Sequence, residues 1–367
     1  MFCLNRTKRV AMKEICLDSC VKELHLSLVF NGQEDALKKV SDALNEFSMC
    51  GASVISAEVY APKGYSQLIE LLEVAPYPYN WICPLDEESE PKLEGLHFTA
   101  IAGCNVQYFK SENSSKAVVY EDSQNIYCKT FGVFANADND DGYLHTHSNL
   151  NELEAVLRMC GFEYTDIART WFYNDDILAW YAPFNKARTE FYQKRGIFDG
   201  LLPASTGIGA PNLKGKKITS GALAIKSKLG KTAGSEGFVV ELPSPLQGGA
   251  TEYGSSFSRA VEITSERSQR IMISGTASIA PDGKTIYLDD IQKQVQLTMD
   301  VIGGILKSRG LDFENTTSSV VYCRKPEYFA EFEKWNKQNN ITFCPAYSIV
   351  CRDDLLFEVE LEAAKNL

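Results

Sequence analysis

Three glutamates alternate with apolar residues near the end of the chain. They are Glu358, Glu360 and Glu362, in the stretch DLLFEVELEA. Because side chains at positions i, i+2 and i+4 of a strand point to the same face, the three carboxylates should form one column. Carboxylates that lie close together raise one another's pKa, so an inner member could stay protonated near neutral pH and act as a general acid. The alternative is a solvent-facing strand edge, and the spacing alone does not exclude it.

A second stretch, residues 168–209, combines aromatic residues, arginines and a glycine-rich end. ARTWFY alternates like a half-buried strand, and DDILAWYAPFNKARTEFYQKRG has the spacing of an amphipathic helix, kinked near Pro183. PASTGIG should form a loop whose glycines let the backbone approach a ligand. The guanidinium of Arg169 could bind a carboxylate with two hydrogen bonds. For Arg188 and Arg195, on the helix, we prefer structural salt bridges.

Composition excludes several classes of function. The chain has 367 residues and a net charge of −11, with no basic run, which argues against nucleic acid or an anionic membrane as partner. Its eleven cysteines are scattered without a CxxC pair, and the HxH pair His145/His147 has no further ligands nearby, so we expect no metal site and no disulfide framework. Reduced cysteines, and the lack of a signal peptide or an apolar span, predict a cytoplasmic protein.

The predicted elements show an internal repeat. Gly161 and Gly310 each close a helix and lie 149 positions apart, and Tyr173 and Tyr322 end the next strand at the same offset. The PAST of residues 203–206 is aligned with the PAYS of residues 345–348. The same strand–helix–strand–helix–strand unit is therefore predicted twice.

This repeat predicts an α+β fold of tandem units, with mixed sheets that helices cover on one face. An N-terminal domain would span residues 1–225, with one divergent unit at about 120–225. The polar, Gly-rich residues 226–237 would form a linker or exposed loop, and residues 238–367 the C-terminal domain. Residues 1–120 show little of the repeat, and their role is open.

The C-terminal unit resembles the reactive-intermediate deaminase (YjgF-like) family through SGTASIAPDG, CPAYSIV and DLLFEVELEA. The resemblance implies a chorismate-mutase-like fold, a trimeric arrangement and ligand sites in clefts between units. Imine deaminases of this family hold the substrate carboxylate with the arginine of a Pro-Ala-Arg-Ser motif. Here that position is Tyr347 in the second copy and Ser205 in the first, which disfavours simple imine deamination.

A longer resemblance, over about residues 120–367, is to the chorismatases, sometimes described as pteridine-dependent deoxygenase-like proteins. It rests on ARTWFY, ILAWYAPFNKART, LLPASTGIGA, EYGSSFSRA and CRDDLLFEVE, in that order. The resemblance implies an enzyme without cofactor or metal that protonates the enolpyruvyl ether of chorismate. Pyruvate would be released, leaving a hydroxybenzoate or a dihydroxycyclohexadiene carboxylate.

The resemblance also implies roles for individual residues. Glu358 matches the general acid, and Glu360 is the fallback, because a slip of two residues keeps the same face. Cys351 matches a cysteine of members that make 3-hydroxybenzoate. Because chorismate is a dianion, several groups are needed to bind it. The binding candidates are Arg169, Thr206, Gly207, Tyr253 and Arg259.

The expected partner is thus a small dianionic molecule, and the protein would be a monomer or a homo-oligomer such as a trimer. Two other functions stay open. One is an imine or enamine hydrolase of the parent YjgF-like family. The other is a non-catalytic small-molecule-binding protein that kept the fold.

Overall fold

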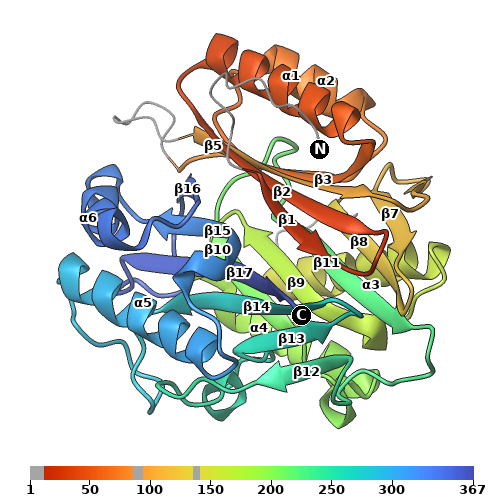
Figure 1. Ribbon diagram of the computed structural model, residues 1–367. Helices are drawn as coiled ribbons and strands as arrows, with labels where there is room; N and C mark the ends of the chain where they lie inside the picture. The colour runs from red at the N-terminus through yellow and green to blue at the C-terminus, as the bar shows by residue number, and fades with distance from the viewer. Residues whose placement is uncertain (1–11, 86–93, 135–140) are drawn as a thin grey trace.

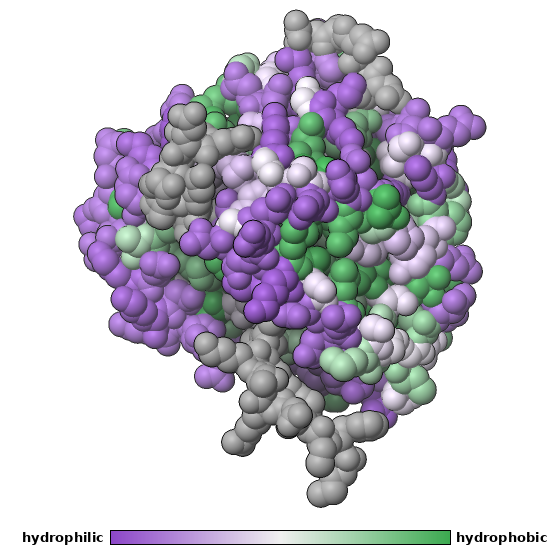
Figure 2. All heavy atoms as spheres, turned by 90° about the horizontal axis from the view of Figure 1, so that it is seen from above, coloured by the Kyte–Doolittle hydropathy of each residue, from purple (hydrophilic) through white to green (hydrophobic). Residues whose placement is uncertain are grey.

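The computed structural model of the protein describes residues 12–85, 94–134 and 141–367 (Figure 1). These residues form three β-sheets with helices at the periphery. The face seen from above Figure 1 is largely hydrophilic, with hydrophobic side chains gathered toward its middle and one side (Figure 2). Among the described helices, none has the length and apolar character that a membrane span requires.

The first sheet belongs to the N-terminal residues, whose role the sequence left open. Its strands in spatial order are β1 (Lys13–Cys16), β2 (Lys22–Phe30), β5 (Glu94–Ala102), β3 (Ala52–Tyr60) and β4 (Tyr79–Ile82). Two helices accompany it, α1 (Gln33–Met49) and α2 (Ser66–Val74).

The second sheet contains six strands in the order β10 (Ala204–Gly209), β9 (Ile167–Asn174), β11 (Ile218–Ser227), β8 (Asn125–Phe134), β7 (Lys116–Glu121) and β6 (Gln107–Lys110). Its helices are α3 (Gly142–Met159) and α4 (Ile177–Lys194). The predicted kink in α4 is confirmed, because Pro183 lies inside the helix and Trp180 has non-helical φ and ψ.

The third sheet also has six strands, in the order β12 (Val239–Leu242), β13 (Ala260–Thr264), β14 (Ser268–Ala277), β17 (Phe357–Asn366), β15 (Thr316–Cys323) and β16 (Cys344–Tyr347). Its helices are α5 (Ile291–Lys307) and α6 (Phe329–Asn339). Asp290 caps the start of α5 by accepting a hydrogen bond from the Lys293 backbone N–H.

The three sheets share one topology, so the α+β fold is confirmed but the predicted number of repeats was too low. Each unit contains a long strand, a helix, a second long strand, a second helix, a short strand parallel to the second, and a final long strand that inserts between the two long ones. Gly51, Gly161 and Gly310 follow the first helix of each unit with φ of 63°, 81° and 68°, the left-handed conformation that ends helices. The first unit was missed because it retains little of the others' sequence.

Equivalent tyrosines mark the centre of the arrangement. Tyr60, Tyr173 and Tyr322 each lie at the end of the second long strand or one residue before it. The Tyr173 hydroxyl lies 3.3 Å from that of Tyr60 and 3.2 Å from that of Tyr322. Equivalent side chains from three units meet in this way only near a threefold axis, so the units surround a pseudo-threefold axis within one chain.

The hydrophobic core includes one cluster in each unit and a further cluster between the units. Each sheet packs its helices over one face in a separate core, as the sequence predicted. The opposite faces of the sheets turn toward one another, and a fourth cluster with residues from all three sheets lies between them. The short parallel strand of each unit packs on the first long strand of the next: β4 on β8, β10 on β14, and β16 on β2. Clefts between units form along these contacts.

Two local predictions are corrected by the strand pairing. PASTGIG forms an edge strand, β10, rather than a loop, because Ala204–Gly209 pair with β9 and Gly209 also exchanges two hydrogen bonds of 2.8 Å with Ile349. The alignment of the two Pro-Ala segments is also wrong by four positions. Tyr173 pairs with Ile208 and Tyr322 with Ala346, so the counterpart of Ala346 is Ile208 rather than Ala204.

The division into domains at residues 226–237 stays a prediction.

Candidate active site

A pocket lies in the cleft between the second and third units. It forms where β10 and α4 of the second unit meet β14 and β17 of the third, and it brings together four of the predicted site residues, Glu358, Cys351, Gly207 and Arg259. Further lining residues are Tyr181, Phe184, Arg188, Ser205, Phe257, Gly275 and Arg352. A carboxyl group, a thiol and several guanidinium groups therefore face one small space.

Glu358 is the carboxyl group of this pocket. All three glutamates of β17 are buried, with exposed fractions of 5%, 5% and 9%, and β17 is a central strand, so a solvent-facing edge is excluded. Burial and the neighbouring charge of Glu360 raise the pKa of Glu358 to about 8, against the opposing effects of Arg169 and Arg259. Glu358 is thus protonated at neutral pH. Gly275 makes room for it, because a Cβ there would collide with the Glu358 carboxyl oxygen.

Glu360 is held in a different environment. Its carboxylate accepts hydrogen bonds from Arg169 Nη2 (2.5 Å), from the Tyr322 hydroxyl (3.0 Å) and from the Thr206 hydroxyl. Arg169 is itself buried and also contacts Thr206 Oγ1 at 2.5 Å. The guanidinium and the two hydroxyl groups hold the Glu360 carboxylate in place. The structure thus places Arg169 and Thr206 behind the pocket wall, next to Glu360, and leaves Glu358 facing the pocket.

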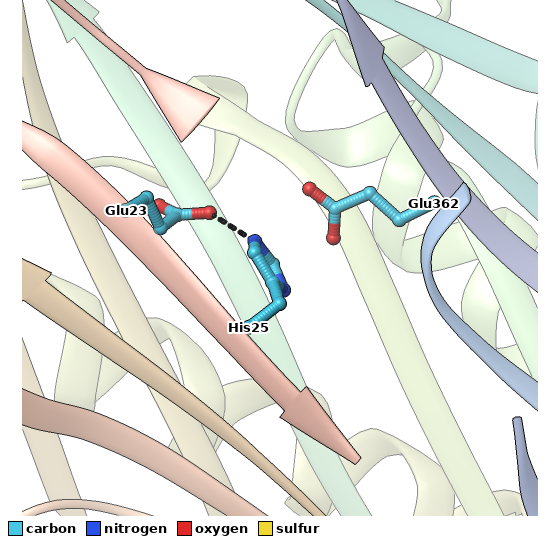
Figure 3. Close-up of side chains that lie close together, drawn as sticks. All are labelled: Glu23, His25 and Glu362. Atoms are coloured by element: carbon cyan, nitrogen blue, oxygen red, sulfur yellow. Dashed lines mark hydrogen bonds and ion pairs between the residues drawn. The ribbon is translucent and has the colours of Figure 1, made fainter. Parts of the chain in front are cut away.

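Glu362, the third member of the column, belongs to an interior polar network. Among the described residues, Glu23, His25 and Glu362 have ligand atoms within 4.8 Å of one another and point toward a common centre (Figure 3). Arg270 Nη1, however, lies 2.5 Å from Glu23 and 3.6 Å from Glu362. Burial favours protonation of Glu23, but Arg270 and His25 hold its pKa well below the usual range. The guanidinium already supplies the cation that these carboxylates need, so we interpret the group as structural.

The arginines of helix α4 differ from each other. Arg195 forms the predicted salt bridge, with its Nε and Nη2 2.7 and 2.6 Å from the Glu154 carboxylate. Arg188 does not: no described carboxylate lies within 4 Å of it, and its Nη2 donates to the Asn185 side chain at 2.8 Å. Its guanidinium lies 4.9 Å from the centre of the Phe184 ring, and the buried Nε–H has no partner among the described atoms. Arg188 is therefore a pocket residue that the sequence reading misassigned.

Arg259 and Arg352 complete the charged lining. Arg259 donates from Nε to the Gly248 carbonyl at 2.9 Å and stacks near Phe257, with 5.7 Å between the guanidinium carbon and the ring centre. Arg352 donates to the Gly283 carbonyl at 2.7 Å. The pocket that contains Glu358 is thus lined by three arginines, Arg188, Arg259 and Arg352, which suits a ligand with more than one carboxylate.

Cys351 lies next to Glu358. Burial within the pocket and the nearby Glu358 raise the pKa of its thiol to about 12, so the thiol stays neutral at physiological pH. No disulfide bond joins cysteines in the described part of the chain. Tyr253 closes a short 3-10 helix, Ala250–Tyr253, but its side chain lies outside the described atoms.

The inner pocket opens into a wider hollow. The inner part encloses about 40 Å³, and the hollow beside it about 520 Å³. Tyr181 and Arg352 line both spaces, and Lys186 and Ser255 lie farther out. The narrow part is too small for a whole cyclic ligand, whose usual site has a few hundred Å³. A ligand would reach from the hollow into the pocket.

No family model matches the chain. The chain is 26% identical, over 225 residues, to a chorismatase from Streptomyces rapamycinicus. The chain is similar to the chorismatases. The match covers 54% of this chain and 64% of the Streptomyces protein, slightly less than two thirds of its length.

A solved structure shows the same fold. A chorismatase crystal structure aligns with 85% of this chain and 93% of its own length, with a TM-score of 0.64 and 18% sequence identity. The alignment therefore extends well beyond the stretch from about residue 120 onward that had carried the sequence resemblance. The resemblance to chorismatases is confirmed, and at this identity the structural likeness shows the fold alone.

Sequence reasoning did not assign Arg188, Tyr181 or Arg352 to the site, although all three line the pocket. The first two lie in ILAWYAPFNKART, one of the segments that resemble chorismatases, and Arg352 directly follows Cys351. That segment was therefore a usable signal for the first two. Helical spacing alone does not tell which face of α4 turns toward β14 and β17.

Proposed function

We propose that this protein is a chorismatase-like enzyme that removes pyruvate from chorismate, with Glu358 as the general acid. The supporting observation is that Glu358 is buried in a cleft lined by arginines, with a pKa raised to about 8. A carboxylic acid that is protonated at neutral pH is what protonation of an enol ether requires. The similarity to chorismatases supplies the substrate.

The proposed reaction begins when Glu358 donates its proton to the terminal methylene carbon of the enolpyruvyl ether. The ether carbon becomes an oxocarbenium ion, and water adds to it while its proton returns to the Glu358 carboxylate. The hemiketal then breaks the bond between its central carbon and the oxygen that is attached to the ring. The hydroxyl proton of the hemiketal moves to this oxygen. Pyruvate and a dihydroxycyclohexadiene carboxylate are the products, with one water consumed.

We favour a second outcome, 3-hydroxybenzoate, because of Cys351. Loss of the enolpyruvyl group as pyruvate with rearrangement of the ring consumes no net water, since 3-hydroxybenzoate and pyruvate together have the composition of chorismate. Cys351 lies beside Glu358 with a neutral thiol. In the proposal this thiol assists the rearrangement and is not a thiolate nucleophile.

Substrate binding is assigned to the guanidinium groups that face the cleft. Arg259, Arg188 and Arg352 bind the two carboxylates, and the backbone at Gly207 lines the opposite wall. Arg169 and Thr206 act through Glu360 as positioning residues: they hold this carboxylate in place, and its charge contributes to the raised pKa of Glu358. Tyr253 stays a candidate hydroxyl donor.

The parent-family alternative, imine or enamine hydrolysis, has less support. The anchoring arginine of that chemistry is replaced by Tyr347 in the third unit, and the position paired equivalently in the second unit is Gly209. A non-catalytic binding protein is disfavoured because such a protein has no need of a buried, protonated acid. A cytoplasmic location remains part of the proposal, in keeping with described cysteines that form no disulfide bond.

The experiment is to incubate purified protein with chorismate, follow pyruvate with a lactate dehydrogenase coupled assay, and separate the aromatic products by chromatography. Wild-type protein should release one pyruvate per chorismate consumed. Glu358→Gln, which keeps the shape but cannot donate the proton, should lower the rate by about 10²- to 10⁴-fold.

Two outcomes would contradict the assignment. Wild-type protein that folds but releases no pyruvate removes the proposed function. If Glu358→Gln is active and Glu360→Gln is not, the acid is Glu360. Circular dichroism of each variant shows whether a loss of activity reflects loss of fold.

A further inference from the structure

The cleft between the first and second units is the counterpart of the candidate active site. There β4 packs on β8, as β10 packs on β14 in the active-site cleft. Strand pairing shows which positions of the two clefts are equivalent. In the first unit, Tyr79 pairs with Ala57, which lies three residues before Tyr60. In the second unit, Ser205 pairs with Thr170, which lies three residues before Tyr173. Tyr79 and Trp81 of this cleft therefore replace Ser205 and Gly207.

The equivalent of the catalytic acid is absent from this cleft. On β17, Glu358 pairs with Tyr322 of one neighbouring strand and with Ala277 of the other. On the equivalent strand β11, Thr219 pairs in the same way with Tyr173 and Phe134. Thr219 thus occupies the Glu358 position in the second unit. A threonine hydroxyl is not a proton donor near neutral pH, so this cleft can bind a ligand but cannot repeat the proposed chemistry.

Four lysines line the cleft, Lys110, Lys116, Lys214 and Lys216. Lys116 donates to carbonyl groups at the end of α2, and Lys214 pairs with Glu73 at 2.8 Å. Burial and the neighbouring Lys110 lower the pKa of Lys116, as expected where positive charges gather. Glu73 is the single acidic residue among the described lining residues, so the cleft is positively charged within a protein of net charge −11.

Aromatic side chains form the wall beside these lysines. Tyr79, Trp81, Phe131 and Phe134 line a space of about 530 Å³, compared with about 40 Å³ in the inner pocket of the other cleft. The Trp81 indole N–H is already bonded to the Ala61 carbonyl at 2.8 Å. The ring is thereby fixed in place.

We propose that this cleft, between α2 and β4 of the first unit and β8 of the second, is a second binding site for a small aromatic carboxylate. Aromatic walls bind a planar ring, and lysines that are not all paired attract its anion. The size of the space falls in the range of small-molecule sites. The proposal does not depend on catalysis in the other cleft.

Isothermal titration calorimetry with benzoate tests the site on the full chain. Wild-type protein should bind benzoate saturably. Lys110→Glu/Lys216→Glu should weaken binding at least about tenfold, because two attractive charges become repulsive. Lys38→Glu/Lys337→Glu, which makes the same charge change at exposed positions outside the cleft, should bind like wild type. Benzyl alcohol, which has the ring without the charge, should bind much more weakly, and inorganic phosphate should not compete.

Other results overturn the proposal. Absence of benzoate binding removes the site, and equal binding by both double variants places the ligand elsewhere. Binding that is lost in Arg259→Met but kept in the cleft variant assigns the ligand to the active-site pocket. Competition by phosphate would show a site for anions in general rather than for aromatic carboxylates. Pyruvate release from chorismate, measured separately, is not expected to change in the cleft variant.

Discussion

Two clefts of the molecule are built from equivalent strands but have different side chains. One contains Glu358, and the other contains the four lysines. The first has a buried acid, a neutral thiol and arginines around a narrow pocket. The second has Thr219 in place of the acid, lysines in place of arginines, and aromatic rings where the first has Ser205 and Gly207.

The difference shows what a repeated scaffold fixes and what it leaves free. Backbone hydrogen bonds determine where each strand lies, so positions such as 219 and 358 recur at the same place in each unit. They do not constrain which side chain faces the cleft. In the third cleft, between β16 and the first sheet, the ring of Pro345 packs against Gly95, and a Cβ at Gly95 would lie 3.1 Å from Pro345 Cδ.

The largest effect is expected from making the two clefts alike at the acid position. Glu358→Thr gives the active-site cleft the residue of the lysine cleft, and kcat/KM for pyruvate release should fall by about 10²- to 10⁴-fold. Thr219→Val, which removes the hydroxyl at the equivalent position of the other cleft without changing the size of the side chain, is the control and should keep activity. A Glu358→Thr protein with wild-type activity would contradict the role of the acid.

The second prediction compares two arginines of α4. Arg188→Met should raise KM for chorismate about 10- to 100-fold, because a charged hydrogen bond to the substrate contributes about 1.5–3 kcal/mol. Arg195→Met removes the salt bridge to Glu154 instead and should leave KM close to that of wild type. Equal KM changes in the two variants would show that Arg188 acts only through the stability of the helix.

The third prediction concerns pH. The proposed general acid, Glu358, would act in its protonated form, and its pKa is raised to about 8, so kcat/KM should be highest below this pH and fall tenfold per unit above it. Because the charge of Glu360 contributes to this shift, Glu360→Gln should move the break to lower pH. The measurement is the pH profile of pyruvate release between pH 6 and pH 10. A wild-type profile without a break in this range argues against Glu358.

The smallest effect is expected on the choice of product. Cys351→Ala should shift the products from 3-hydroxybenzoate toward the dihydroxycyclohexadiene carboxylate, with pyruvate release largely retained, because protonation by Glu358 does not need the thiol. Chromatography of the products measures the ratio. Cys20→Ser, at an exposed position, is the control. An unchanged ratio in Cys351→Ala would remove the role assigned to this thiol.

Much of the candidate site could be predicted from the sequence. The alternation of Glu358, Glu360 and Glu362 placed them on one face because a strand has a period of two. The resemblance to chorismatases then pointed to Cys351, and the need to bind a dianion pointed to Arg259; both residues line the same pocket. The first unit was not predicted because it shares few residues with the repeat of the other two units, Gly51 and Tyr60 among them. The order of its strands shows the shared topology.

The sequence by itself determined two of the three repeated units, the α+β class and the column of acids, because these follow from the order and spacing of residues along the chain. Tertiary structure decided which of these acids faces the pocket. Arg169 reaches Glu360 across 191 positions of sequence and pairs with it, which leaves Glu358 to face the pocket. The tertiary structure also places Arg188 in the active-site cleft and gives the two clefts different lining side chains. Ion pairing and burial depend on which units meet, and no local pattern in the chain contains that information.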